Sequence, residues 1–230
     1  WQAIREPGAA EELLDAVREK MSRRNYDASR ALFELFQNAV DAARQGSGKS
    51  DVHVEVQRDE TGQVCNLRFV HWGRPINHPG ANAPPRFARD LDNMLDMDSS
   101  EKDGMHGRHG LGFKTVHMLS NDARVASGRL RFRILGGMIP ESWEEGRELQ
   151  QIYNRKLALA TVIDMPVPPE LAEGAAMAWE AFERVAPFLP VTAPEIGQII
   201  LCDGDALPSG EAKPHDIGLG LAIVDYGQGR

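Results

Sequence analysis

Residues 31 to 43 read ALFELFQNAVDAA, and this stretch decides which fold to expect. Its apolar residues recur at intervals of three and four, which is typical of a helix that buries one face. The pattern extends from Ala28 to Arg44 and stops at Gly46-Ser47-Gly48. We therefore predict a helix over residues 28 to 44.

Three polar residues interrupt this apolar helix. Glu34 and Asn38 are four residues apart and Asp41 follows three residues later, so all three share one helix face. The amide oxygen of Asn38 could help to hold Mg²⁺ beside phosphates, and the carboxylate of Glu34 could position and deprotonate a water. The same stripe is also typical of a solvent-facing surface helix, so both interpretations stay open at this point.

The rest of the chain predicts an α+β fold, with two helices first and a sheet after them. Strict alternation over residues 52–56 and 66–70 predicts a hairpin. Residues 73–106 are rich in Gly, Pro, Asn, Asp and Ser and predict a long loop with a short helix near residues 87–95. Further helices are expected over residues 9–21, 110–119 and 170–185, and further strands over residues 131–135, 160–165 and 196–201.

A second glycine-rich element, HGRHGLGFK, spans residues 106 to 114. Gly107, Gly110 and Gly112 precede a predicted helix, and glycines allow backbone N–H groups to approach phosphates closely. Lys114 could pair with a phosphate. A tight turn without any ligand is the alternative for this element.

Composition sets the class of the protein. Hydrophobic residues make up 42% and charged residues 26% of the chain, as in ordinary soluble globular proteins. The net charge of -8 argues against a broad nucleic-acid or anionic-membrane surface. Cys65 and Cys202 are too few for a zinc site or a disulfide framework, and no apolar stretch is long enough to cross a bilayer. We expect a cytoplasmic protein, and because the chain begins at Trp1 it could be a piece of a longer one.

These elements occur in a definite order: the acidic helix, a strand ending in HWGRPI at residues 71–76, the polar loop and the glycine turn. This order resembles the GHKL superfamily of gyrase, heat-shock-90 chaperones, histidine kinases and MutL. The wording QNAVDAA, HWGRPI, SSEK and GRHGLGFKTVHML is most similar to the sacsin-like branch. The resemblance covers roughly residues 8 to 165, and more loosely continues to Leu201.

The resemblance implies a two-layer α/β sandwich of the Bergerat type, with a mixed, mostly antiparallel sheet and helices on one face. It implies ATP and Mg²⁺ as ligands, with Glu34 as general base, Asn38 as the Mg²⁺ ligand and Asp41 as a supporting residue. Gly73 would lie against adenine, and Thr161 would help to hold it. The phosphates would be wrapped by the backbone of Gly107, Gly110, Leu111, Gly112 and Phe113, with assistance from Lys114.

One position departs from the superfamily pattern. His71 stands where the superfamily usually has Asp, whose carboxylate accepts the adenine amino group. A neutral imidazole accepts through one nitrogen only. Either His71 takes over this contact, or another group or a water does, or base selectivity is relaxed; a purely structural histidine at a strand end is the alternative.

We expect residues 1–165 to form the nucleotide-binding domain, with a lid at about residues 77–106. Residues 166–230 would form a helix-strand extension and could begin a further domain. Gly218 to Val224 also resembles a glycine motif of histidine kinases. It lies too far after Glu34, and after the lid and adenine motifs, so we interpret it as a strand or a tail.

The expected function is Mg-dependent ATP binding with slow hydrolysis. Lid closure would be coupled to homodimerisation or to motion of attached domains, with a protein partner that the sequence does not identify. The alternative is a nucleotide-gated scaffold that turns over little or no ATP. A histidine kinase ranks last, because none of the seven histidines lies on a preceding helix.

Overall fold

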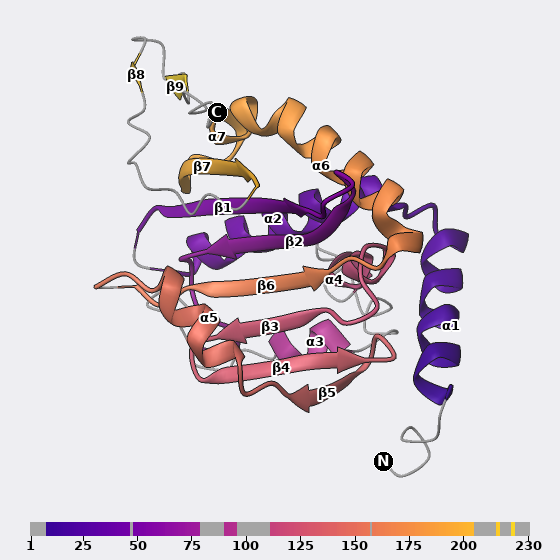
Figure 1. Ribbon diagram of the computed structural model, residues 1–230. Helices are drawn as coiled ribbons and strands as arrows, with labels where there is room; N and C mark the ends of the chain where they lie inside the picture. Colours follow the sequence, from indigo (N-terminus) through magenta and orange to yellow (C-terminus); the bar gives the residue numbers. More distant parts are fainter. Residues whose placement is uncertain are drawn as a thin grey trace.

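The computed structural model describes residues 8–46, 48–78, 90–95, 111–156 and 158–204, together with two short C-terminal strands. The described chain forms a seven-stranded sheet in the order β5-β4-β3-β6-β2-β1-β7 (Figure 1). The strands of this sheet are β1 (Ser50–Arg58), β2 (Val64–His71), β3 (Arg124–Ser127), β4 (Leu130–Leu135), β5 (Ile139–Ser142), β6 (Thr161–Pro166) and β7 (Ile196–Asp203).

Helices connect these strands. The α-helices are α1 (Ala9–Arg23), α2 (Ala31–Arg44), α3 (Asp90–Leu95), α4 (Leu111–Lys114), α5 (Gly146–Tyr153), α6 (Ala172–Val185) and α7 (Leu189–Thr192). Short 3-10 turns η2 (Ala28–Arg30), η4 (Thr115–Met118), η5 (Pro169–Leu171) and η6 (Ala186–Phe188) extend or precede α2, α4, α6 and α7. The prediction of a helix over residues 28–44 thus corresponds to η2 followed directly by α2.

The sheet is mixed but mostly antiparallel, which confirms the predicted fold class. All of its neighbouring strands pair antiparallel except β1 and β7, which run parallel. A parallel neighbour needs a long crossover connection, and the helix α6 lies in the connection from β6 to β7. Residues after 165 therefore add a strand to the edge of the same sheet.

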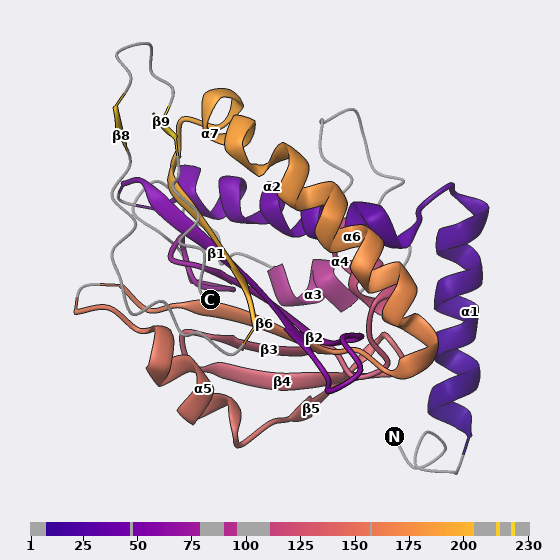
Figure 2. The ribbon, with the colours of Figure 1, turned by 45° about the horizontal axis from the view of Figure 1, so that its top comes forward.

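One face of the sheet carries the main core, and we call it the helical face. Val52, Val54 and Val56 alternate along β1 and are fully buried on this face. The helices α2 and α6 lie across it in Figure 2. Phe182 of α6 stacks against Phe33 and Phe36 of α2 and against Phe69 of β2 in tilted or edge-on geometry. This packing fixes α2 against the centre of the sheet.

The opposite face, which we call the far face, carries a second and smaller core. Val70, Ala126 and Val162 point to it, because each neighbours in sequence a residue that points to the helical face. The helix α5 covers part of this face through Tyr153. The sheet therefore has most of its helices on one face, as predicted, and one short helix on the other.

The sequence did not reveal β3, β5 and α5. β3 has only four residues and no clear alternation, yet it lies between β4 and β6. The segment at residues 218–224, which we interpreted as a strand or a tail, contains β9 (Ala222–Ile223), which pairs with β8 (His215–Asp216). The rest of the glycine segment at residues 218–224 lies outside the described residues.

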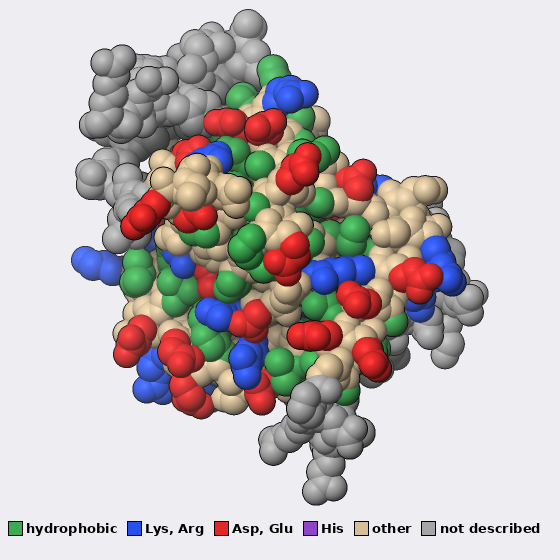
Figure 3. Space-filling model, turned by 45° about the vertical axis from the view of Figure 1, so that its right-hand side comes forward, with side chains coloured by type: hydrophobic (Ala, Val, Ile, Leu, Met, Phe, Trp, Pro, Cys, Tyr) green, Lys and Arg blue, Asp and Glu red, His purple; other side chains and the backbone are tan. Residues whose placement is uncertain are grey.

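The surface carries side chains of both charges, as expected from the 26 basic and 34 acidic residues of the sequence. On the face in Figure 3, acidic and basic side chains of the described residues are interspersed. None of the helices in the described part of the chain has both the length and the apolar character of a membrane span.

Candidate functional site

A cavity of about 410 Å³ opens on the helical face of the sheet, and we call it the pocket. It is lined by segments that are far apart in the sequence: α2, the end of β2, α3, the start of α4 and the start of β6. Its volume lies in the range of small-molecule sites. Seven residues that the sequence singled out line it: Glu34, Asn38, Asp41, His71, Gly112, Phe113 and Thr161.

Glu34 lies in the first turn of α2 and points toward the glycine turn at α4. A Cβ built on Gly112 would lie 2.3 Å from Oε2 of Glu34, so the absence of a side chain at Gly112 gives the carboxylate its place. Burial raises the pKa of Glu34, and the guanidinium of Arg30, 3.4 Å from Oε1, opposes this rise. A carboxylate with a raised pKa is suited to accept a proton.

Asn38 and Asp41 continue the same helix face. The side chain of Asn38 is exposed to the pocket, and Asp41 lies 3.6 Å from Arg44. Among the described residues there is no group of three or more His, Cys, Asp and Glu side chains that could hold a metal on its own. Mg²⁺ commonly uses one or two protein oxygens together with phosphates and waters. The amide oxygen of Asn38 fits that use, with Glu34 and Asp41 beside it.

His71 ends β2 and is buried in the floor of the pocket. Burial lowers its pKa to about 4, and the nearby Arg74 contributes to this shift. The imidazole is therefore neutral at pH 7. Its Nδ1 accepts a hydrogen bond of 3.2 Å from the backbone N–H of Gly73.

Gly73 packs against α2 and does not line the pocket. A Cβ at this position would lie 2.8 Å from the carbonyl carbon of Ala42, so any side chain here would displace the helix or the strand end. The next residue, Arg74, donates its backbone N–H to the carbonyl of Ala42 at 2.9 Å. The structure thus gives Gly73 a role in close packing.

Thr161 begins β6 and pairs with His71 in the antiparallel register. Its Oγ1 lies 2.6 Å from Oγ of Ser127, which in turn accepts the backbone N–H of Ile76 at 2.9 Å. Thr161 and Ser127 are both buried. No sequence pattern pointed to Ser127, since β3 itself was not predicted.

The glycine turn is only partly within the described residues. Gly107 and Gly110 lie outside them, and for Leu111 the structure describes the backbone alone. Gly112 and Phe113 line the pocket, and Phe113 also joins the main core. The predicted wrapping of phosphates by residues 107–113 stays a prediction.

Lys114 lies apart from the pocket lining. Its side chain is fully buried, and Nζ donates to the carbonyl of Gly137 at 2.7 Å and to that of Leu95 at 3.0 Å. These contacts direct the ammonium group into the protein interior between α3 and the β4–β5 turn. The structure does not bring Lys114 to where we predicted that it would assist a phosphate.

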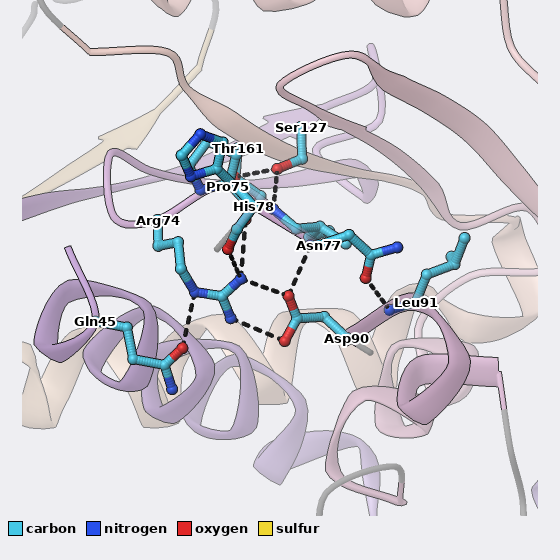
Figure 4. A network of polar contacts seen from close by, with 10 residues as sticks. Gln45, Arg74, Pro75, Asn77, His78, Asp90, Leu91, Ser127 and Thr161 are labelled. Atoms are coloured by element: carbon cyan, nitrogen blue, oxygen red, sulfur yellow. Dashed lines mark hydrogen bonds and ion pairs between the residues drawn. The ribbon is translucent and has the colours of Figure 1, made fainter. Parts of the chain in front are cut away.

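A buried arginine at the rim of the pocket was not predicted. Arg74 binds both carboxylate oxygens of Asp90, at 2.7 and 2.8 Å, and donates to Gln45 at 2.8 Å (Figure 4). Asn77 donates its N–H to Asp90, and its side chain accepts the N–H of Leu91. This network joins the end of α2 and the exit of β2 to α3. The useful signal was a charged residue directly after the glycine of HWGRP.

The predicted lid at residues 77–106 is described only at residues 77–78 and in α3. Through the Arg74–Asp90 pair, α3 is held at the rim, and Asn93 and Met94 line the pocket. The remainder of this segment lies outside the described residues.

No family model matches the chain, and the search of curated proteins finds no match. Among solved structures, the chain is similar to the topoisomerase IV ATP-binding domain of Francisella tularensis in complex with a small-molecule inhibitor. The identity is 14%, the match covers 83% of this chain and 90% of that chain, and the TM-score is 0.47. This comparison names an ATP-binding domain and does not single out the sacsin-like branch.

Proposed function

We propose that the pocket binds a Mg-bound nucleoside triphosphate and hydrolyses it slowly, with ATP as the ligand implied by the GHKL resemblance. One observation carries the proposal: Glu34, Asn38, His71, Gly112 and Thr161, from four separate segments, line a single cavity. A solvent-facing stripe would account for α2 alone. It would not account for the meeting of α2 with the strand ends and the glycine turn.

The two ends of the pocket suit the two parts of a nucleotide. The end formed by α2 carries Glu34, Asn38 and Asp41, which are the oxygen-bearing groups suited to a metal-bound phosphate chain. The sheet end combines Ile163 with the polar groups of His71 and Thr161. An apolar wall with a few fixed polar groups is typical of a site for a flat heterocycle. We therefore place the base at the sheet end.

Glu34 would act as the general base. Its raised pKa keeps it a better proton acceptor than an ordinary carboxylate, and it would draw a proton from a water that attacks the terminal phosphate. Magnesium, held by Asn38 and the phosphates, would neutralise part of the charge of the phosphate chain. Arg30 lines the pocket with its side chain 51% exposed and can offer a further positive charge.

Lid closure, a cytoplasmic location and a protein partner belong to the same proposal. Closure of a lid at about residues 77–106 would couple nucleotide binding to homodimerisation or to motion of attached domains. The described cysteines, Cys65 and Cys202, are both free, which agrees with a reducing compartment such as the cytoplasm. We also propose a protein partner, which we do not identify.

The test compares wild type with Glu34→Ala, using phosphate release for turnover and calorimetry for binding of a non-hydrolysable triphosphate. We expect turnover to fall by about 10²- to 10⁴-fold, the usual contribution of a general base, while affinity stays nearly unchanged. Glu173→Ala, an exposed site on α6, is the matched control.

Each outcome has a distinct meaning. Equal turnover in wild type and Glu34→Ala would refute the catalytic role of Glu34. Binding without any turnover in wild type would favour the nucleotide-gated scaffold. Absence of binding to any nucleotide would refute both versions of the proposal.

A further inference from the structure

A row of buried polar side chains crosses the floor of the pocket. His71 of β2 pairs with Thr161 of β6, and Thr161 pairs with Ser127 of β3. All three point to the helical face, because they alternate with residues of the far face along their strands. A base at the sheet end of the pocket would meet the two members of this row that line it, His71 and Thr161.

The position of the proton on His71 follows from its contacts. The ring is neutral, because burial lowers its pKa to about 4. Nδ1 accepts the N–H of Gly73, so the single ring proton must be on Nε2. Among the described residues, the hydrogen bond to this ring is the one from Gly73, and it occupies Nδ1 and not Nε2.

The backbone of the strand end holds this arrangement in place. Gly73 packs closely on α2, since a Cβ there would lie 2.8 Å from the carbonyl carbon of Ala42. The N–H of Arg74 is fixed to Ala42, and the Arg74 side chain is held by Asp90 and Gln45. The Gly73 N–H therefore continues to occupy Nδ1, and Nε2 stays a donor.

Thr161 does not impose a similar demand. Ser127 Oγ accepts a hydrogen bond from the backbone N–H of Ile76, and it lies 2.6 Å from Oγ1 of Thr161, where either hydroxyl can be the donor. If Ser127 donates, Thr161 can donate to a ligand, and in both arrangements Thr161 keeps a lone pair with which to accept. A hydroxyl adapts to either kind of ligand atom, whereas a ring N–H only donates. His71 is thus the residue that discriminates.

We propose that His71 makes this pocket prefer 6-oxopurine nucleotides, such as inosine and guanosine triphosphates, over adenine nucleotides. The proposal rests on the proposed function, since it assumes that a base lies at the sheet end. The 6-oxo group is an acceptor and satisfies the Nε2 proton, whereas the 6-amino group of adenine is a donor and opposes it. Adenine can still bind if its N1 lone pair, instead of its 6-amino group, faces His71. It then gives up the orientation in which the 6-substituent of a purine faces this residue.

The decisive experiment is calorimetric titration of wild type with three Mg-bound triphosphates: those of inosine, of adenosine, and of purine riboside, which has no 6-substituent. Inosine triphosphate tests the 6-oxo group without the 2-amino group of guanine. We expect it to bind about tenfold more tightly than ATP, with purine riboside triphosphate between them, because an opposed buried donor commonly costs this much. Equal or tighter binding of ATP would overturn the inference.

Two variants sharpen the test. His71→Asp replaces the donor by an acceptor and is expected to reverse the preference to ATP. His71→Asn can present either its amide N–H or its oxygen, so the preference should shrink to less than about threefold. A preference for inosine triphosphate that survives in a folded His71→Asp, checked by circular dichroism, would also overturn the inference.

The test separates this inference from the function on which it depends. If all three nucleotides fail to bind wild type, the proposed function is refuted and the base preference with it. If they bind with ATP equal or preferred, the proposed function stands and the role of His71 as a donor is refuted. The wild-type comparison decides even if His71→Asp does not fold.

Discussion

Each of the two faces of the sheet holds a cluster of buried or half-buried polar side chains, but the clusters differ in how many hydrogen bonds their members make. On the far face, Arg68 donates to Glu55 at 2.9 Å and to Asp164 at 3.0 Å, and Tyr153 donates to Glu55 at 2.6 Å. On the helical face, Glu34 has Arg30 at 3.4 Å, and the hydrogen bond that the described residues make to the ring of His71 is the one from Gly73 to Nδ1.

The pKa shifts reflect the same difference. Burial alone would lower the pKa of Arg68, but Asp164, Tyr153 and Glu55 raise it overall, so the far-face cluster favours its charged form. Burial raises the pKa of Glu34 and lowers that of His71, so these two pocket residues are pushed toward their neutral forms. A completed buried network stabilises a fold, whereas an incomplete one next to a cavity has capacity left for a ligand.

The largest expected effect on stability lies in the far-face cluster. Arg68→Ala leaves Glu55 and Asp164 buried without their common partner, and we expect the free energy of unfolding to fall by about 3–5 kcal/mol. Nucleotide affinity of the folded fraction should not change. Denaturant unfolding measures the loss of stability, and calorimetry measures the nucleotide affinity.

Arg58→Ala is the matched control, because Arg58 makes a partly exposed pair with Asp203 at 3.0 Å. We expect it to cost less than about 1 kcal/mol. A large loss of nucleotide affinity in Arg68→Ala at little cost in stability would contradict the distinction between the two clusters.

In the pocket, Gly112→Ala should impair activity more than stability. The added Cβ would lie 2.3 Å from Oε2 of Glu34, so the carboxylate must turn away. We expect turnover to fall by about tenfold or more, because a small displacement of a catalytic group has effects of at least this size. Gly174→Ala on α6 is the control, since its Cβ would meet Ala28 at 3.2 Å, away from the pocket. Unchanged phosphate release in Gly112→Ala would separate the glycine turn from Glu34.

Asn38→Ala tests the metal ligand. We expect affinity for the Mg-bound triphosphate to fall by about tenfold, and affinity measured in the presence of a chelator to change little. Gln37→Ala, also exposed and lining the pocket, is the neighbouring control. An equal loss with and without Mg²⁺ would show that Asn38 contacts the nucleotide and not the metal.

The smallest effect concerns pH. The pKa of Glu34 is raised above 4.5, so the folded protein holds this proton more tightly than the unfolded chain. The stabilisation that this gives is present below pH 4.5 and is lost as pH rises through the raised pKa. Glu34→Gln should therefore be more stable than wild type at pH 7, and this advantage should vanish below pH 4.5. A difference that grows in acid would contradict the shift.

The sequence predicted the parts of the molecule with strong local patterns. The periodicity of residues 28–44 and the alternation of residues 52–56 and 66–70 correspond to η2 and α2, β1 and β2. β3 was missed because its four residues carry no periodicity, and its place in the sheet comes from pairing on both sides.

In the pocket, the sequence likewise predicted which residues matter but not which contacts they make across the fold. The motifs singled out Glu34, Asn38 and Thr161, and the structure brings them together. They could not predict the Arg74–Asp90 pair or the proton position on His71, because both depend on contacts across the fold. Lys114 follows a glycine turn in sequence, but the single turn of α4 directs its side chain inward to Gly137.

The most direct measurement is the ¹⁵N spectrum of the histidine rings, with His71 assigned from the His71→Gln variant, before and after saturation with a Mg-bound triphosphate. We expect a neutral ring at pH 7, with Nδ1 unprotonated, Nε2 protonated, and an Nε2 proton resonance that shifts on nucleotide binding. A charged imidazolium, or a His71 signal that does not respond to saturating nucleotide, would contradict it.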